Sequence, residues 1–191
     1  MSTPSVTWYN TLVMDHSVPK NVPALLPIVK YGHPVLVKKA KPVGKIDENI
    51  LRLIPAMFNT MYAEPGIGLA APQVGLSIRV MVVDVAPDGK SQPLALINPR
   101  IDERKGHIKS EEGCLSFPGI QVTVPRAAYV RMSAVNEKGL PVTIEAEGLL
   151  SRCLQHELDH LDGVVMIDHL SVGQRLKALW DIRQRKKNGL W

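Results

Sequence analysis

The stretch that decides the fold is LLSRCLQHELDHLDG, residues 149–163. Its leucines recur at helical spacing, and Gly163 suits the left-handed turn that ends many helices, so the pattern predicts one buried helix. Within it, His156 and His160 stand four residues apart in an H-E-x-x-H pattern. On a helix this spacing places both imidazoles on one face, about 6 Å apart along the axis. Two imidazoles on one face can bind the same metal ion, so we predict a central metal-binding helix.

Glu157 follows the first histidine directly and adds a carboxylate to the pattern. This carboxylate can take a proton from a water molecule that the metal activates, which is the arrangement that hydrolysis needs. The alternative interpretation is an amphipathic helix whose two histidines are satisfied by ordinary hydrogen bonds. The flanking leucines favour the metal, because a buried pair of imidazoles beside a carboxylate is costly without a partner.

The third metal ligand is not evident from the helix itself. A catalytic zinc site uses three protein ligands and keeps one position open. No glutamate follows His160, and Met166 occupies the position where a compact H-E-x-x-H-x-x-G-x-x-H site carries its third histidine. The residue that zinc endopeptidases use as third ligand is therefore missing from this chain, although Asp168 and His169 remain available as ligands.

The chain has two cysteines, and either could supply a thiolate. Cys153 shares the histidine face but lies about 10.5 Å along the axis from His160, too far for all three side chains to bind one ion. We interpret Cys153 as a thiol of the core or of a pocket wall. Cys114 stands between Gly113 and Pro118-Gly119, residues typical of a turn, and a thiolate presented by a turn can approach the helix. An ordinary buried cysteine is the alternative for Cys114.

The remaining pattern favours an α+β domain, in which antiparallel or mixed sheets surround the metal-binding helix and a further helix lies at the C-terminus. Asp47 caps a predicted helix that runs toward Tyr62 and that Pro55 kinks or splits. Ser171 caps the C-terminal helix. The predicted strands are 78–85, 94–97 (ended by Asn98-Pro99), and 128–135 with 141–147 as a hairpin.

Length and composition bound the class of protein. The 191 residues suit one domain, which we place at 28–191 after an irregular N-terminal arm, 1–27. The arm lacks the basic start and apolar run of a secretory signal, and no stretch is apolar enough for a membrane span. Two cysteines favour reduced thiols over a disulfide scaffold, so we expect a cytoplasmic protein. Much of the net charge of +5 lies near the C-terminus, as a solvated helix face or a contact with an acidic partner.

Three segments, taken together, resemble one family, the peptide deformylases. Gly66-Ile67-Gly68-Leu69-Ala70-Ala71-Pro72-Gln73 is similar to their G-x-G-L-A-A-x-Q motif, Glu112-Gly113-Cys114-Leu115-Ser116 to E-G-C-L-S, and Gln155-His156-Glu157-Leu158-Asp159-His160 to Q-H-E-x-D-H. Order and spacing also match, and the resemblance extends from about Ile28 to about Trp180. Each motif alone is weakly or moderately specific, but the three in this order are highly specific.

The resemblance implies an enzyme that removes the formyl group from the N-terminal formyl-methionine of new polypeptides and releases formate. Cys114, His156 and His160 would bind one divalent metal ion, natively ferrous iron, with zinc, nickel or cobalt as replacements. Glu157 would act as the acid and base of the hydrolysis. The rival functions are a zinc endopeptidase and a non-enzymatic module whose metal site is structural.

The resemblance also implies the rest of the site. The side-chain amide of Gln73 and the backbone N–H of Leu115 would stabilise negative charge on the formyl oxygen. Gly68 would let the peptide lie alongside as an extra strand and, with its neighbours, would form the methionine pocket. The other pocket residues would be Ile67, Gly113, Cys153 and Leu154, with core packing as the alternative for Ile67 and the two helix residues.

Two further features concern the residues around the site. Many relatives carry arginine in a P-x-x-R stretch after E-G-C-L-S, where this chain has Gln121, so a contact made by that arginine is not expected here. Arg126 matches a V-P-R-A stretch of relatives and either braces Glu112 or lies at the surface. The basic C-terminal segment, Arg183 to Lys187, would contact the ribosome, as in bacterial relatives.

Overall fold

The structure is a computed structural model, and it describes residues 18–19 and 21–191. The helices among these residues are η1 (Pro34–Val37), α2 (Glu48–Ala63), η2 (Ala71–Val74), η3 (Pro87–Gly89), α3 (Gly148–Asp162), η4 (Met166–His169) and α4 (Val172–Lys187). The strands are β1 (Gly68–Ala70), β2 (Val80–Val83), β3 (Leu94–Lys105), β4 (Ile108–Gly113), β5 (Gln121–Arg126), β6 (Tyr129–Val135) and β7 (Pro141–Glu147).

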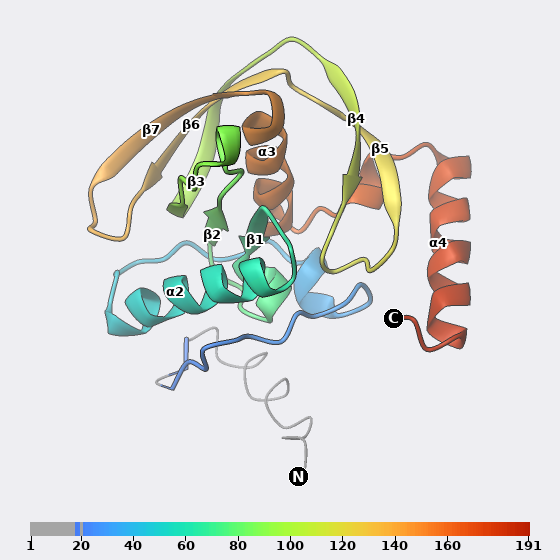
Figure 1. Cartoon of the computed structure of the whole chain (residues 1–191), viewed down its shortest axis with the longest axis horizontal. Coiled ribbons are helices and arrows are strands. Elements are labelled where there is room, and N and C mark those ends of the chain that lie inside the picture. Colours follow the sequence, from blue (N-terminus) through green and yellow to red (C-terminus); the bar gives the residue numbers. More distant parts are fainter. Residues whose placement is uncertain (1–17, 20) are drawn as a thin grey trace.

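The strands form two antiparallel sheets around α3, which confirms the predicted α+β class. One sheet has five strands in the order β1-β2-β3-β6-β7, and the other is the hairpin of β4 and β5. In Figure 1, α3 lies between strands β3, β6 and β7 on one side and β4 and β5 on the other. The helix that carries H-E-x-x-H is therefore the centre of the molecule, as expected from its leucines.

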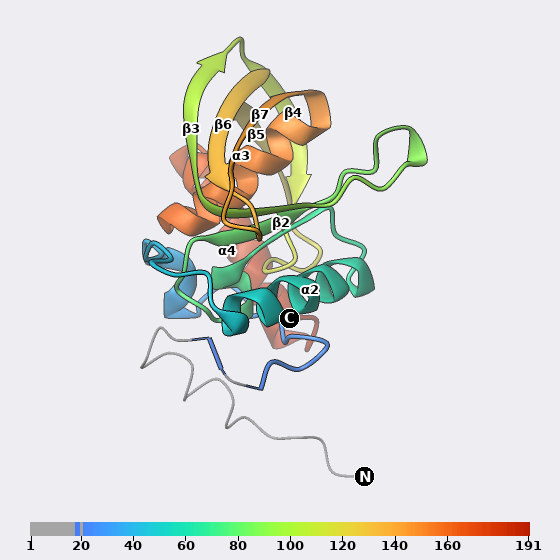
Figure 2. The ribbon, with the colours of Figure 1, turned by 90° about the vertical axis from the view of Figure 1, so that its left-hand side faces the viewer.

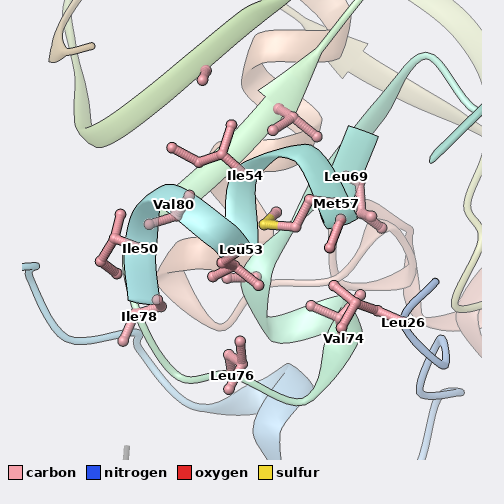
Figure 3. Packing of buried hydrophobic residues seen from close by; sticks show 14 of the residues in the cluster. Leu26, Ile50, Leu53, Ile54, Met57, Leu69, Val74, Leu76, Ile78 and Val80 are labelled. Atoms are coloured by element: carbon pink, nitrogen blue, oxygen red, sulfur yellow. The ribbon is translucent and has the colours of Figure 1, made fainter. Parts of the chain in front are cut away.

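Strand β2 separates two layers of core, because alternate side chains of a strand point to opposite faces. Val80 and Val82 pack with α2 in one cluster, which Figure 3 shows from close by. Met81 and Val83 pack with α3 in a second cluster. Figure 2 shows the result, with α2 and α3 on opposite sides of β2. A strand that is buried on both faces has no polar alternation, which is why β2 (Val80–Val83) is a continuous apolar run within the predicted strand 78–85.

Helix α2 is continuous, so the expectation that Pro55 could split it is wrong. Asp47 caps the helix as predicted, since its carboxylate accepts hydrogen bonds from the backbone N–H groups of Asn49 and Ile50. Proline removes one backbone hydrogen bond from a helix. Leu53 and Met57, on either side of Pro55, are fully buried in the first cluster and hold the helix together across that gap.

Strand β3 does not end at Asn98-Pro99, contrary to the prediction; it continues to Lys105. The register shifts between Ile97 and Arg100, as in a β-bulge, and Asn98 has a positive φ of 53°. The Asn98 side chain accepts from the N–H of Val43 and donates to its carbonyl, which offsets the strain. A bulge leaves backbone groups unpaired, so it can accommodate proline within a strand.

The other predicted elements are confirmed, apart from one hairpin that the pattern did not reveal. The β6–β7 hairpin forms, α3 ends at Gly163 with a φ of 75°, and Ser171 precedes α4. The β4–β5 hairpin escaped prediction because β4 contains Glu111 and Glu112, and glutamate is depleted in strands. The missed hairpin is important, because Cys114 follows its first strand directly.

The predicted N-terminal arm lies largely outside the described residues. In its described part, Val18 and Leu26 are buried in the first cluster, and the N–H of Leu26 donates to the Thr60 hydroxyl on α2. The boundary at residue 28 stays a prediction. Among the described helices, none has the length and apolar character that crossing a membrane requires.

Candidate active site

Polar residues of helix α3 bind the backbone of Ala127, in the connection between β5 and β6. The Gln155 side chain accepts from the N–H of Ala127 at 2.9 Å and donates to the Ala127 carbonyl at 3.0 Å. Ser151, one turn earlier, donates to the same carbonyl. These contacts fix the rotation of the helix about its axis. His156 and His160 consequently face the β4–β5 hairpin.

Cys114 lies beside His156 and His160 and forms a three-residue cluster with them. It follows β4 and enters a tight turn, in which the N–H of Phe117 donates to the Cys114 carbonyl at 2.8 Å. Its Sγ lies 3.2 Å from Nε2 of His160, and one donor atom from each of Cys114, His156 and His160 lies within 4.8 Å of the others. The turn predicted around Cys114 therefore brings the thiol to both imidazoles.

The other candidates for a third ligand lie elsewhere. Asp168 accepts from the N–H of Val165 at the start of η4. His169 contacts Asp159 at 2.6 Å. Cys153 is buried one helical turn before Glu157, and its Sγ donates to the Ile67 carbonyl. Within the described part of the chain, the group that can hold a metal ion consists of Cys114 and the two histidines alone.

The chemistry of these donors suits a divalent metal ion. Burial alone would raise the pKa of the Cys114 thiol, but the imidazoles of His160 and His156 hold that pKa well below its usual range. The cluster therefore offers one thiolate and two imidazoles, a set that zinc and iron both accept. Nδ1 of His156 lies 2.9 Å from Oε2 of Glu112, which leaves Nε2 available on the side of Cys114. Such carboxylate–histidine contacts orient metal ligands in general.

Arg126 supports this arrangement from behind and is not a surface residue. Its guanidinium is buried, and it donates to both carboxylate oxygens of Glu112 at 2.9 Å. Burial would raise the pKa of Glu112, but hydrogen bonds from Arg126 and His156 hold it at about 2. Arg126 also binds Asp159 on α3. The arginine therefore ties β4 to α3 and keeps Glu112 charged beneath His156.

Glu157 is buried beside the cluster and has a free oxygen. The residue is 4% exposed, and Oε2 has no hydrogen-bond partner among the described residues. Burial raises the pKa of Glu157 to about 7. A carboxyl group with a pKa near neutrality can both take and give a proton, which is the property of a general acid and base.

The cluster opens into a cavity of about 790 Å³. Its lining includes Cys114, His156 and Glu157, and also most of the residues predicted for substrate contacts. Those residues are Ile67, Gly68, Gln73, Gly113, Leu115 and Cys153. The site thus combines three side chains that can hold a metal ion, a buried carboxyl group and an adjacent cavity of a size that ligand sites usually have.

Comparison with known proteins agrees with this geometry. The family model for polypeptide deformylase matches residues 25–175. The chain belongs to the polypeptide deformylase family. Peptide deformylase of Neisseria meningitidis serogroup B is 48% identical over 165 residues, which cover 86% of this chain and 98% of the relative. That of Alkalilimnicola ehrlichii is 49% identical over 166 residues, covering 87% and 93%. A crystal structure of a peptide deformylase from Legionella pneumophila has a TM-score of 0.81 and 42% identity, covering 86% of this chain and 97% of that one.

Membership in the deformylase family decides between the functions that the sequence left open. The chain is a metal-dependent hydrolase that removes the N-formyl group from new polypeptides. The zinc endopeptidase and the module with a structural metal site are therefore not supported. The geometry agrees, since the described residues that could hold an ion are three, the number of protein ligands that catalytic zinc sites use.

In this deformylase, Gly68 occupies a position where a side chain would collide with the site. A Cβ added there would lie 2.5 Å from Oε1 of Glu157 and 2.7 Å from Sγ of Cys153. Such distances are far inside van der Waals contact. The sequence suggested that Gly68 lets the substrate approach; the structure adds that glycine here leaves room for Glu157.

The side-chain amide of Gln73 is oriented toward the site by a hydrogen bond with the backbone of Ala70. Oε1 of Gln73 accepts from the N–H of Ala70 at 2.7 Å, so Nε2 turns toward Cys114, whose Sγ is 3.5 Å away. The side chain is 1% exposed. The amide of Gln73 therefore has a fixed direction at the wall of the cavity.

One residue predicted for the pocket lies elsewhere, and several residues that line the cavity were not predicted. Leu154 is fully buried in the second core cluster and does not line the cavity. Leu149 and Arg152 line it instead, one helical turn before Cys153 and His156, so helical spacing could have identified them. Lys30 also lines the cavity, and no local pattern could have indicated that.

Proposed function

We propose that Cys114, His156 and His160 hold the metal ion of this deformylase and that Glu157 transfers the protons. The observation that carries the proposal is the convergence of these donor atoms within 4.8 Å, next to a buried carboxyl with a free oxygen. When bound, a divalent ion supplies Lewis acidity and lowers the pKa of water.

The protein groups divide the reaction between them. Glu157 accepts a proton from the attacking water, whose oxygen forms a bond to the formyl carbon. Charge then builds on the formyl oxygen, where Nε2 of Gln73 and the N–H of Leu115 donate hydrogen bonds. Glu157 returns the proton to the amine nitrogen as the carbon–nitrogen bond breaks. The products are formate and a free N-terminus, and Glu157 ends in its starting state.

The substrate peptide would add a strand to the edge of the sheet. Strand β1 pairs with β2 on one side only, and it is the edge strand of the five-stranded sheet. Its first residue, Gly68, lines the cavity. A peptide paired with this edge would direct its first side chain toward Ile67, Gly113 and Cys153. These residues are our proposed methionine pocket, and Gln121, where many relatives carry arginine, lines the same cavity.

The resident ion is ferrous iron in this proposal. Protein purified without oxygen should contain about one iron per chain and release formate from formyl-methionyl peptides, with no cleavage of internal peptide bonds. Elemental analysis paired with a formate assay measures both. Zinc as the ion in anaerobically purified, active protein would exclude iron, and cleavage of internal bonds would contradict the deformylase mechanism.

We further propose that this enzyme works in the cytoplasm at the ribosome, through α4. Arg175, Lys177, Arg183 and Lys187 are exposed on this helix, which lies at the edge of the molecule in Figure 1. Clustered positive charge favours nucleic acid. Replacing these four residues with glutamine should abolish co-sedimentation with ribosomes in low salt, while deformylation of free peptides persists. Unchanged co-sedimentation would contradict the proposal.

A further inference from the structure

A short segment near the start of the described chain contacts both proposed oxyanion donors. The N–H of Val29 donates to the backbone carbonyl of Gln73 at 2.8 Å. The Lys30 ammonium donates to the backbone carbonyl of Leu115 at 3.0 Å, and the N–H of Tyr31 to that of Ser116 at 2.9 Å. Residues 29–31 thus bridge η2, which carries Gln73, and the turn after β4, which carries Leu115.

The bridge matters because the two donors come from separate parts of the chain. Gln73 lies in η2, next to the five-stranded sheet, whereas Leu115 lies in the turn after β4. Oxyanion donors are effective only when they are held in place before the charge develops. A displacement of about 1 Å can cost on the order of 100-fold in rate. The spacing between the two donors therefore needs a support, and residues 29–31 provide one.

Lys30 is the member of the bridge that acts through its side chain. It is half-buried and lines the cavity, and its ammonium reaches a carbonyl 85 positions later in the sequence. A hydrogen bond from a charged donor is roughly twice as strong as a neutral one. By holding the Leu115 carbonyl, the ammonium fixes the peptide unit that follows Leu115. The N–H of Leu115 belongs to the preceding unit, and with the following unit fixed it can turn only through the two backbone dihedral angles of Leu115.

We propose that Lys30 is a positioning residue for the oxyanion donor of this deformylase. It acts through Leu115 and does not touch the reacting atoms. The inference rests on the proposed role of the Leu115 N–H and adds to it a residue that none of the three motifs contains. The contact stabilises the transition state more than the bound substrate, because the formyl oxygen gains most of its negative charge after the substrate has bound.

The test is the variant Lys30→Met, which keeps the length and apolar stem of the side chain but removes the donor. We expect kcat to fall about 10-fold, with KM changed by less than about 2-fold, because a misdirected N–H affects the transition state. Metal content and melting temperature should stay at wild-type values. Lys30→Arg should recover most of kcat, since guanidinium also donates. Lys39→Met, an exposed lysine nearby, is the matched control and should leave kcat unchanged.

Gln73→Ala, measured in parallel, separates failure of this inference from failure of the proposed function. If Gln73→Ala lowers kcat and Lys30→Met does not, the positioning role is wrong while the proposed mechanism stands. If both variants keep wild-type kcat, the oxyanion role fails and the inference fails with it. A loss of metal or of thermal stability in Lys30→Met, or no recovery in Lys30→Arg, would show a general structural role and would overturn the proposal.

Discussion

Glu157→Gln is expected to lower kcat for deformylation by about 1000-fold while the protein keeps its metal. Proton transfer by a positioned side chain typically contributes about 100- to 10,000-fold. Glutamine has the size of glutamate but cannot carry the proton from water to the departing amine. Because Glu157 is buried with an unpartnered oxygen, a neutral amide in its place should not reduce stability. The measurement is kcat on a formyl-methionyl peptide, together with elemental analysis of the same sample.

This prediction has a control variant and two outcomes that would contradict it. Glu145→Gln, on the exposed face of β7, is the control and should behave as wild type. Near wild-type turnover in Glu157→Gln would exclude the acid and base role. A loss of both turnover and metal would indicate that Glu157 supports the cluster and would leave its catalytic role without evidence.

Cys114→Ala is expected to weaken metal binding by at least about 100-fold, since loss of residues that merely support a ligand already costs about 10- to 100-fold. Removal of the thiolate leaves two imidazoles and takes away the one negative charge among the three donors. Deformylation should fall in parallel with metal content, in contrast to Glu157→Gln. Elemental analysis after dialysis against a weak chelator measures the loss.

The matched control is Cys153→Ala, which removes the other cysteine of the chain. Cys153 belongs to the second core cluster, and its Sγ contacts a backbone carbonyl, so its variant should keep a full complement of metal. Full metal in Cys114→Ala would refute the proposed ligand set. Loss of metal only in Cys153→Ala would transfer the role to that thiol.

Elements with a strong local signal were predicted correctly. The leucines of α3 and the glycine that ends it specify a helix wherever the rest of the chain lies, and the β6–β7 hairpin has its turn and its alternation within 20 residues. The expectations that Pro55 could split α2 and that Asn98-Pro99 ends a strand were wrong for one shared reason. Local sequence rules predict that proline interrupts a helix or a strand. In this protein, contacts with residues distant in sequence keep α2 and β3 continuous through their prolines.

The sequence by itself determined the helix with its two histidines and Glu157, because helical periodicity converts spacing directly into a shared face. It also determined the family, since three motifs in order have little chance of arising otherwise. The family resemblance implied that Cys114 joins the histidines, but only the tertiary structure decided between that contact and an ordinary buried cysteine. It also decided that Arg126 is buried beneath the histidines and that Lys30 reaches Leu115. Each of these contacts joins residues from separate elements, and the packing of the whole core sets such distances, which no local pattern encodes.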